Sequence, residues 1–167
     1  TSLPNRNLFV DRLNQALVLT DRNHSKTALL FIDLDRFKYV NDTYGHHVGD
    51  LLLQQVADRL RSEVRKSDTV ARLGGDEFAV IISNITKFRV VEKVANKILQ
   101  SLSQPYRLNE HEAYISCSIG IAFYPDHSSQ PETLLIHADS AMYKAKQKGR
   151  NTYEYFNETL SQDVHQR

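Results

Sequence analysis

A pair of glycines followed by two acids and an apolar run, within residues 72–82, restricts the fold more than any other feature of this sequence. Gly74 and Gly75 permit the tight turn of a β-hairpin, and the apolar run has the composition of a strand. We therefore predict two strands joined by a turn that carries Asp76 and Glu77. Side chains alternate along a strand, so only one of these acids is expected to aim at a given site unless the turn bends. Taken alone, the pattern favours an ordinary hairpin with a solvated acidic tip.

A second acidic cluster reverses that preference. Residues 28–32 are all apolar, as expected of a central strand covered on both faces, and Asp33 and Asp35 follow directly. In layered α/β folds, ligand and cation sites lie at the C-terminal ends of such strands. If Asp33 lies beside Asp76, the two carboxylates suit Mg2+, which keeps its other positions for water and substrate phosphates. A metal bridged to phosphates suggests phosphoryl or nucleotidyl transfer.

Hydrophobic periodicity predicts alternating helices and strands. Helices are expected over residues 5–20, 50–64, 86–103 and 131–149, and strands over 27–34, 69–73, 78–82, 114–124 and 153–156. The polar stretch 36–50 is predicted to be a loop, and Gly120 to mark a bulge or a close approach. The order β-α-β-β-α-β predicts an α+β, ferredoxin-like fold: an antiparallel sheet with helices on one face, plus an extra N-terminal helix and a C-terminal strand.

Composition narrows the class of protein. The chain has 167 residues, 41% of them hydrophobic, which suits one globular domain with a sizeable core. We expect this domain to span residues 1–156, and residues 157–167 to form a linker or connecting helix. The 21 basic and 20 acidic residues give a net charge of +1, which argues against a general nucleic-acid or membrane-surface binder. A single cysteine, Cys117, predicts a reducing, cytoplasmic setting and a core position.

Polar side chains elsewhere could complete a nucleotide site. Lys38 follows the first acidic cluster, and Lys146 and Arg150 lie near the end of the last helix, where cations also interact favourably with the helix dipole. Asn41 and Asp50 carry the amide and carboxylate groups that can read a purine edge. The His46-His47 pair lacks the spaced partners of a transition-metal site.

Taken together, these motifs resemble the GGDEF family of bacterial diguanylate cyclases. The resemblance implies a nucleotide-cyclase or palm-like fold and the condensation of two GTP molecules to cyclic di-GMP, with release of two pyrophosphates. Residues 1–6 resemble the family's opening motif, with Ser2 where a glycine is usual. The matching segments follow the family's order and spacing: 33–42, Gly45-His46, Gly49-Asp50, 72–78, Ala138-Asp139, 142–146 and 149–151.

The resemblance also implies roles for individual residues. The metal, Mg2+ with Mn2+ as an alternative, would be held by Asp33, the carbonyl of Leu34 and Asp76, with Glu77 as a further ligand. Asp76 would also help to deprotonate the attacking 3′-hydroxyl, and Lys38 would offset charge in the transition state. The remaining substrate contacts would come from Asn41, Asp50 and the neighbouring His46 for guanine, and from Gly74, Gly75, Lys146 and Arg150 for the rest of the nucleotide.

Product inhibition and assembly are further implications. Arg65 and Asp68 fall at the family's inhibitory site for cyclic di-GMP, and an arginine fork suits guanine or phosphate oxygens. A chance charged pair at a helix end is the alternative. The second arginine of many family members is matched here by Lys93 and Lys97, so inhibition is expected to be weaker. Each domain would supply one GTP, which implies a homodimer of domains controlled by an upstream sensory domain, in a full-length protein that could be membrane-anchored.

Two further hypotheses compete with the active cyclase. One is a catalytically silent GTP-binding GGDEF domain that regulates an attached EAL phosphodiesterase domain, because residues 155–160 resemble the connection into such a domain. The other is a purely structural dimerisation module. The intact acids, Lys38 and loop glycines favour the active enzyme.

Overall fold

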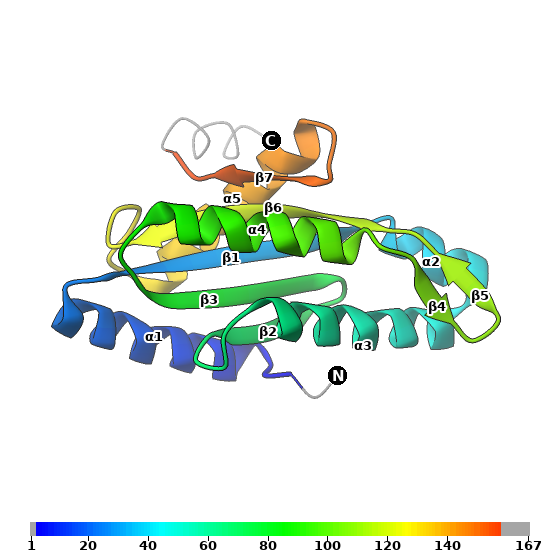
Figure 1. Cartoon of the computed structure of the whole chain (residues 1–167), viewed down its shortest axis with the longest axis horizontal. Coiled ribbons are helices and arrows are strands. Elements are labelled where there is room, and N and C mark those ends of the chain that lie inside the picture. The colour runs from blue at the N-terminus through cyan, green and yellow to red at the C-terminus, as the bar shows by residue number, and fades with distance from the viewer. Residues whose placement is uncertain (1–2, 158–167) are drawn as a thin grey trace.

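A mostly antiparallel sheet forms the centre of the computed structural model, which describes residues 3–157 (Figure 1). Its five strands lie in the order β2-β3-β1-β6-β7, and only the pairing of β6 with β7 is parallel. The long central strand β1 pairs with β3 on one side and with β6 on the other. The strands are β1 (Lys26–Asp35), β2 (Thr69–Gly74), β3 (Glu77–Ile85), β6 (Ser116–Tyr124) and β7 (Thr152–Tyr155).

Helices cover both faces of this sheet. Alternate residues of β1, such as Leu30 and Ile32, enter a core with α3 (His46–Glu63) and α4 (Phe88–Leu102). Leu29 and Phe31 enter a second core with α1 (Arg6–Asn23) and α5 (Pro131–Gln147). The expectation of helices on one face was therefore wrong, because a strand that is apolar on both faces needs two covering layers.

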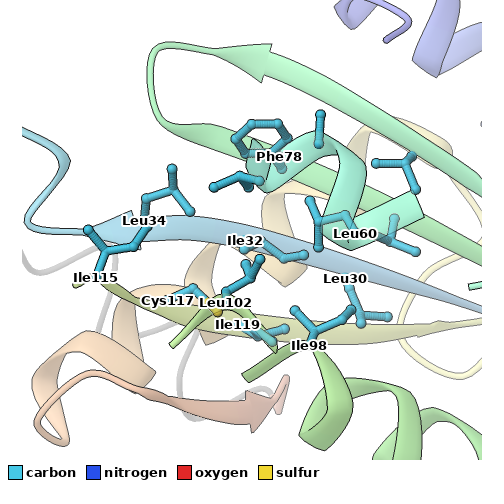
Figure 2. Close-up of a cluster of buried hydrophobic side chains, with 14 of the residues drawn as sticks. Leu30, Ile32, Leu34, Leu60, Phe78, Ile98, Leu102, Ile115, Cys117 and Ile119 are labelled. Carbon is cyan, nitrogen blue, oxygen red and sulfur yellow. The ribbon is translucent and has the colours of Figure 1, made fainter. Parts of the chain in front are cut away.

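Figure 2 shows the first of these cores. Leu30, Ile32 and Leu34 of β1 lie among side chains from β3, β6, α3 and α4. Cys117 belongs to the same cluster and is fully buried, as predicted, and burial raises the pKa of its thiol. Its position explains an inert packing role for this cysteine.

The α+β, ferredoxin-like fold is confirmed, with the order β1-α3-β2-β3-α4-β6 at its centre. Two local predictions differ. The expected loop 36–50 contains α2 (Phe37–Tyr44) and the first turn of α3, because Phe37 and Val40 bury one helical face while Gly45, at φ 93°, separates the two helices. A small hairpin of β4 (Tyr106–Leu108) and β5 (His111–Ala113) was not predicted.

The end of the predicted domain at residue 156 stays a prediction, and residues 158–167 of the expected linker lie outside the described part. Between residues 3 and 157, no helix combines the length and apolarity needed to cross a bilayer.

Gly120 marks a close approach between β6 and α5. The pairing of β1 with β6 runs without interruption past Gly120, so there is no bulge at this point. A Cβ atom added to Gly120 would lie 1.9 Å from the carbonyl oxygen of Ala138 and 2.2 Å from the amide nitrogen of Met142. The backbone of α5 therefore rests directly on the backbone of β6.

We expect Gly120→Ala to lower the free energy of unfolding by about 3 kcal/mol, because the clash is with backbone that cannot rotate away. Urea denaturation followed by far-UV circular dichroism measures this. Ala122→Gly, two positions along on the same face of β6, removes a methyl group instead and should cost about 1 kcal/mol. Equal stability of Gly120→Ala and the wild type would contradict the close approach.

Candidate functional site

Three carboxylates meet where β1 ends and β3 begins. Glu77 is the register partner of Asp33, so their side chains leave the sheet on the same face. The backbone N–H of Leu34 donates a hydrogen bond of 3.1 Å to the carbonyl oxygen of Asp76, which ties the glycine turn to the end of β1. The side chain of Asp76 also interacts directly with that of Asp33. The turn therefore bends enough for both acids of the hairpin tip to approach Asp33.

Burial and mutual repulsion make this cluster electrostatically unfavourable by itself. The pKa of Asp33 is raised from 3.8 to about 6: burial is the largest cause, the nearby Asp76 adds to it, and a 2.6 Å ion pair with Lys146 opposes it. Burial also raises the pKa of Glu77, with additional repulsion from Asp33 and Asp139. The site thus holds more carboxylates than the cations of the protein neutralise, which favours binding of a further cation.

The donor set fits a hard divalent cation. The Oδ1 atom of Asp33 is buried and has no hydrogen-bond partner, so it retains a full acceptor capacity inside the site. Over residues 3–157, no three His, Cys, Asp or Glu side chains enclose a metal position among themselves. Mg2+ binds through one or two carboxylates and completes its shell with water and phosphate oxygens, so the unpartnered Oδ1 atom of Asp33 is the donor that fits it.

Arg72 fixes the glycine turn and was not singled out from the sequence. Its Nε and Nη2 atoms donate to the carbonyl oxygen of Gly75 at 3.1 and 2.8 Å, and its backbone N–H donates to Pro4 at 3.2 Å. Gly75 has a φ of 43° and Gly74 a φ of 156°, values that favour glycine. An arginine three residues before the second glycine was the signal available in the sequence.

The predicted guanine-reading residues gather at the junction of α2 and α3. Asn41 packs against Gly49, where an added Cβ would lie 1.8 Å from the Oδ1 atom of Asn41. This Oδ1 atom is buried and lacks a hydrogen-bond partner. His46 and Asp50 are exposed and lie one turn apart on α3. The junction thus offers an unused buried acceptor beside an exposed carboxylate.

The predicted phosphate-binding residues are only partly assembled. Lys146 contacts Asp33 directly, and Arg150 lies just beyond α5 with its Nε atom 3.9 Å from Oδ1 of Asp35. Lys38 is exposed on α2 and, among the described residues, forms no ion pair with the carboxylates of the site. The structure therefore joins Lys146 to the acidic cluster and leaves Lys38 directed to solvent.

Arg65 and Asp68 lie at the opposite end of β2 from the glycine turn. Arg65 donates through Nε and Nη2 to the carboxylate of Asp68, at 3.1 and 2.9 Å, and through Nη2 to the carbonyl oxygen of Ser83 at 2.6 Å. Asp68 is buried, whereas about half of the Arg65 side chain is exposed. The pair is an ordered link between the end of α3 and the sheet, and its exposed arginine edge remains accessible.

Comparison with known proteins shows which family this chain belongs to. Residues 1–152 match the family described as "Diguanylate cyclase, GGDEF domain". The chain belongs to the GGDEF domain family. It is 50% identical over 161 residues to the bifunctional diguanylate cyclase/cyclic di-GMP phosphodiesterase MucR of Pseudomonas aeruginosa. This match covers 96% of this chain and 23% of MucR. It is 45% identical over 153 residues to the diguanylate cyclase TpbB of the same organism, covering 91% of this chain and 35% of TpbB.

A solved structure of the GGDEF domain of TpbB, also called YfiN, is similar throughout. It superposes with a TM-score of 0.95 at 42% sequence identity and covers 99% of this chain and 96% of the other. The GGDEF chain described here spans about a quarter to a third of the length of the two curated relatives. Its family and its cyclase-type fold are therefore established, whereas the site roles stay predictions.

We expect Asp33 to make stability depend on pH. Its folded-state pKa of about 6 exceeds the ordinary value of 3.8, so in the metal-free domain ionisation of Asp33 lowers the free energy of unfolding as pH rises from 3.8 to about 6. Asp33→Asn should remove this contribution and stabilise the metal-free domain above pH 6 by roughly 1 kcal/mol. Urea denaturation of both proteins between pH 4 and pH 8, with a chelator present, measures the difference. A difference that is constant across this range would contradict the assignment.

Proposed function

We propose that this domain is an active diguanylate cyclase that condenses two GTP molecules into cyclic di-GMP and two pyrophosphates. The observation that carries the proposal is the buried Oδ1 atom of Asp33, which has no hydrogen-bond partner and belongs to a carboxylate that interacts electrostatically with Asp76 and Glu77. Membership of the GGDEF family supplies the reaction class.

In each half of the reaction, the 3′-oxygen of one GTP forms a bond to the α-phosphorus of the other, and the bond from that phosphorus to the pyrophosphate oxygen breaks. Asp76 takes part in removing the proton from the 3′-hydroxyl. Asp33, the carbonyl of Leu34 and Asp76 would hold Mg2+, or Mn2+ in its place, and Glu77 would add a ligand. The bound cation would stabilise negative charge on the transferring phosphorus centre.

The remaining residues bind and orient the nucleotide. The unpartnered Oδ1 of Asn41 accepts from guanine N–H groups, and exposed Asp50, with His46 beside it, adds a second acceptor at the same junction. Gly74 and Gly75 allow the phosphates to approach the backbone of the turn. Lys146 moves between Asp33 and the phosphates, and Lys38, which is exposed, turns toward the α-phosphate when substrate is bound.

Two such domains face each other during catalysis, because one site holds only one GTP and the attacking hydroxyl must come from the other. In the full-length protein we place this domain in the cytoplasm. Upstream sensory domains control activity by bringing domains together, and cyclic di-GMP binds at Arg65 and Asp68 as an inhibitor.

A second function is favoured by one comparison. PdeR of Escherichia coli, which is 43% identical to this chain over 164 residues, is named only as a cyclic di-GMP phosphodiesterase, and the chain covers 24% of its length. The domain could therefore bind GTP without turnover and regulate an attached EAL phosphodiesterase domain. Incubating a forced dimer of the domain with GTP and Mg2+ separates the two functions, because binding without cyclic di-GMP would favour the regulatory one.

We expect Asp76→Asn to lower the rate of cyclic di-GMP formation by about 10²- to 10⁴-fold, because it removes both a general base and a metal-binding charge while preserving shape. The rate is measured chromatographically with a dimer forced by a fused coiled coil. Asp42→Asn, an exposed carboxylate on α2, is the matched control and should keep wild-type activity. Unchanged turnover in Asp76→Asn would remove Asp76 from the mechanism.

We expect Arg65→Ala to raise the cyclic di-GMP concentration needed for half-inhibition by at least about tenfold, because charge-assisted hydrogen bonds to the ligand are lost. Initial rates at increasing product concentration measure this. Lys66→Ala, at the exposed neighbouring position, should behave like the wild type. Since Arg65 also binds Asp68 and Ser83, thermal denaturation must show that the variant is folded at the assay temperature. Equal inhibition of the folded variant and the wild type would refute this site.

A further inference from the structure

Asp35, the last residue of β1, is buried and accepts several hydrogen bonds from separate segments of the chain. Its carboxylate accepts from the hydroxyl groups of Ser116 at 2.6 Å and Ser118 at 2.9 Å, both on β6. It also accepts from the backbone N–H of Asn151 at 3.2 Å, in the loop between α5 and β7. Only 3% of Asp35 is exposed. No catalytic, metal or substrate role in the proposed reaction uses this residue.

The loop that Asp35 holds has an unfavourable backbone. Gly149, Arg150 and Asn151 have φ values of 114°, 66° and 52°, so two consecutive non-glycine residues adopt left-handed conformations. Such residues are strained, and they persist only where their surroundings hold them. The backbone N–H of Arg150 donates to the carbonyl oxygen of Ala145 at 3.1 Å, and that of Asn151 donates to Asp35. Asp35 therefore anchors this pair of residues to the sheet through its side chain.

The same carboxylate also limits where the Arg150 side chain can go. Nε of Arg150 lies 3.9 Å from Oδ1 of Asp35, while about half of the arginine side chain is exposed. Asp33, two residues earlier on the same face of β1, holds Lys146 in the same way at 2.6 Å. Carboxylates at alternate positions of β1 thus contact two cations, Lys146 and Arg150, which are four residues apart in sequence.

We propose that Asp35 is a positioning residue that presents Arg150 to the phosphates of the nucleotide, by fixing the loop 149–151 through Asn151 and by restraining the guanidinium through its charge. The inference rests on the proposed function, in which Lys146 and Arg150 hold the phosphates. A carboxylate suits the task because it only accepts hydrogen bonds, and the groups around it are hydroxyl, amide and guanidinium donors. Asparagine would turn an N–H2 group toward one of these donors and would leave Arg150 without an opposing charge.

A double-mutant cycle with Arg150 tests this proposal. GTP binding to the domain in the presence of Mg2+ is measured by calorimetry for wild type, Asp35→Asn, Arg150→Ala and the double variant, and turnover is measured in forced dimers. We expect Asp35→Asn to weaken GTP binding and raise KM about tenfold, with kcat changed less than about threefold, and to have little further effect once Arg150 is alanine. Asp126→Asn, which removes an exposed ion pair with Lys26, is the control and should leave binding unchanged.

The outcomes separate the possible failures. If the wild type binds GTP and Asp35→Asn binds GTP equally well, the positioning role is overturned and the proposed function stands. Equal losses on Asp35→Asn in the wild-type and Arg150→Ala backgrounds would show that Asp35 acts through general stability, which also overturns it. A wild-type domain that does not bind GTP would overturn the proposed function together with this inference. If Asp35→Asn fails to fold, Ser118→Ala removes one of the two hydroxyl donors to Asp35 on β6, and it should weaken GTP binding in the same non-additive way.

Discussion

The burial of β1 on both faces is the constraint on which the rest of the structure depends. A strand that is apolar at every position from Ala28 to Ile32 must be covered twice, by α3 and α4 on one face and by α1 and α5 on the other. Asp33 continues this strand, so its carboxylate lies at the edge of the buried layers. Desolvation is accordingly the largest cause of its raised pKa.

This position has a thermodynamic consequence for the domain without bound ligands. Ionisation of a buried carboxylate with a raised pKa destabilises the fold. A cation that binds the ionised carboxylate removes this cost, so the buried Asp33 favours cation binding. Lys146 offsets part of this cost in the absence of ligands. Substrate phosphates and a metal would compete for both partners of the ion pair, so binding rearranges charges that are already close together.

Much of the site could be predicted because its residues follow from strand order. Asp33 and Asp76 meet since β1 and β3 are neighbours in a βαββαβ sheet, and a strand end and a turn are both readable from apolar runs and glycines. Helices over residues 36–50 were missed because the stretch is mostly polar, and its buried apolar residues are the widely spaced Phe37, Val40 and Val48. The contacts of Arg72 with the carbonyl of Gly75 and of Asp35 with the N–H of Asn151 were missed because these partners are backbone groups, which no side-chain pattern reveals.

The contact at Gly120 fixes how α5 can move. A helix that packs through side chains can slide by a turn, about 5.4 Å, by exchanging one ridge for the next. Here the carbonyl of Ala138 and the amide of Met142 sit over a strand position with no side chain, so the helix has no groove along which to shift. Lys146 lies one turn beyond Met142, so the backbone contact at Gly120 keeps it close to the end of β1.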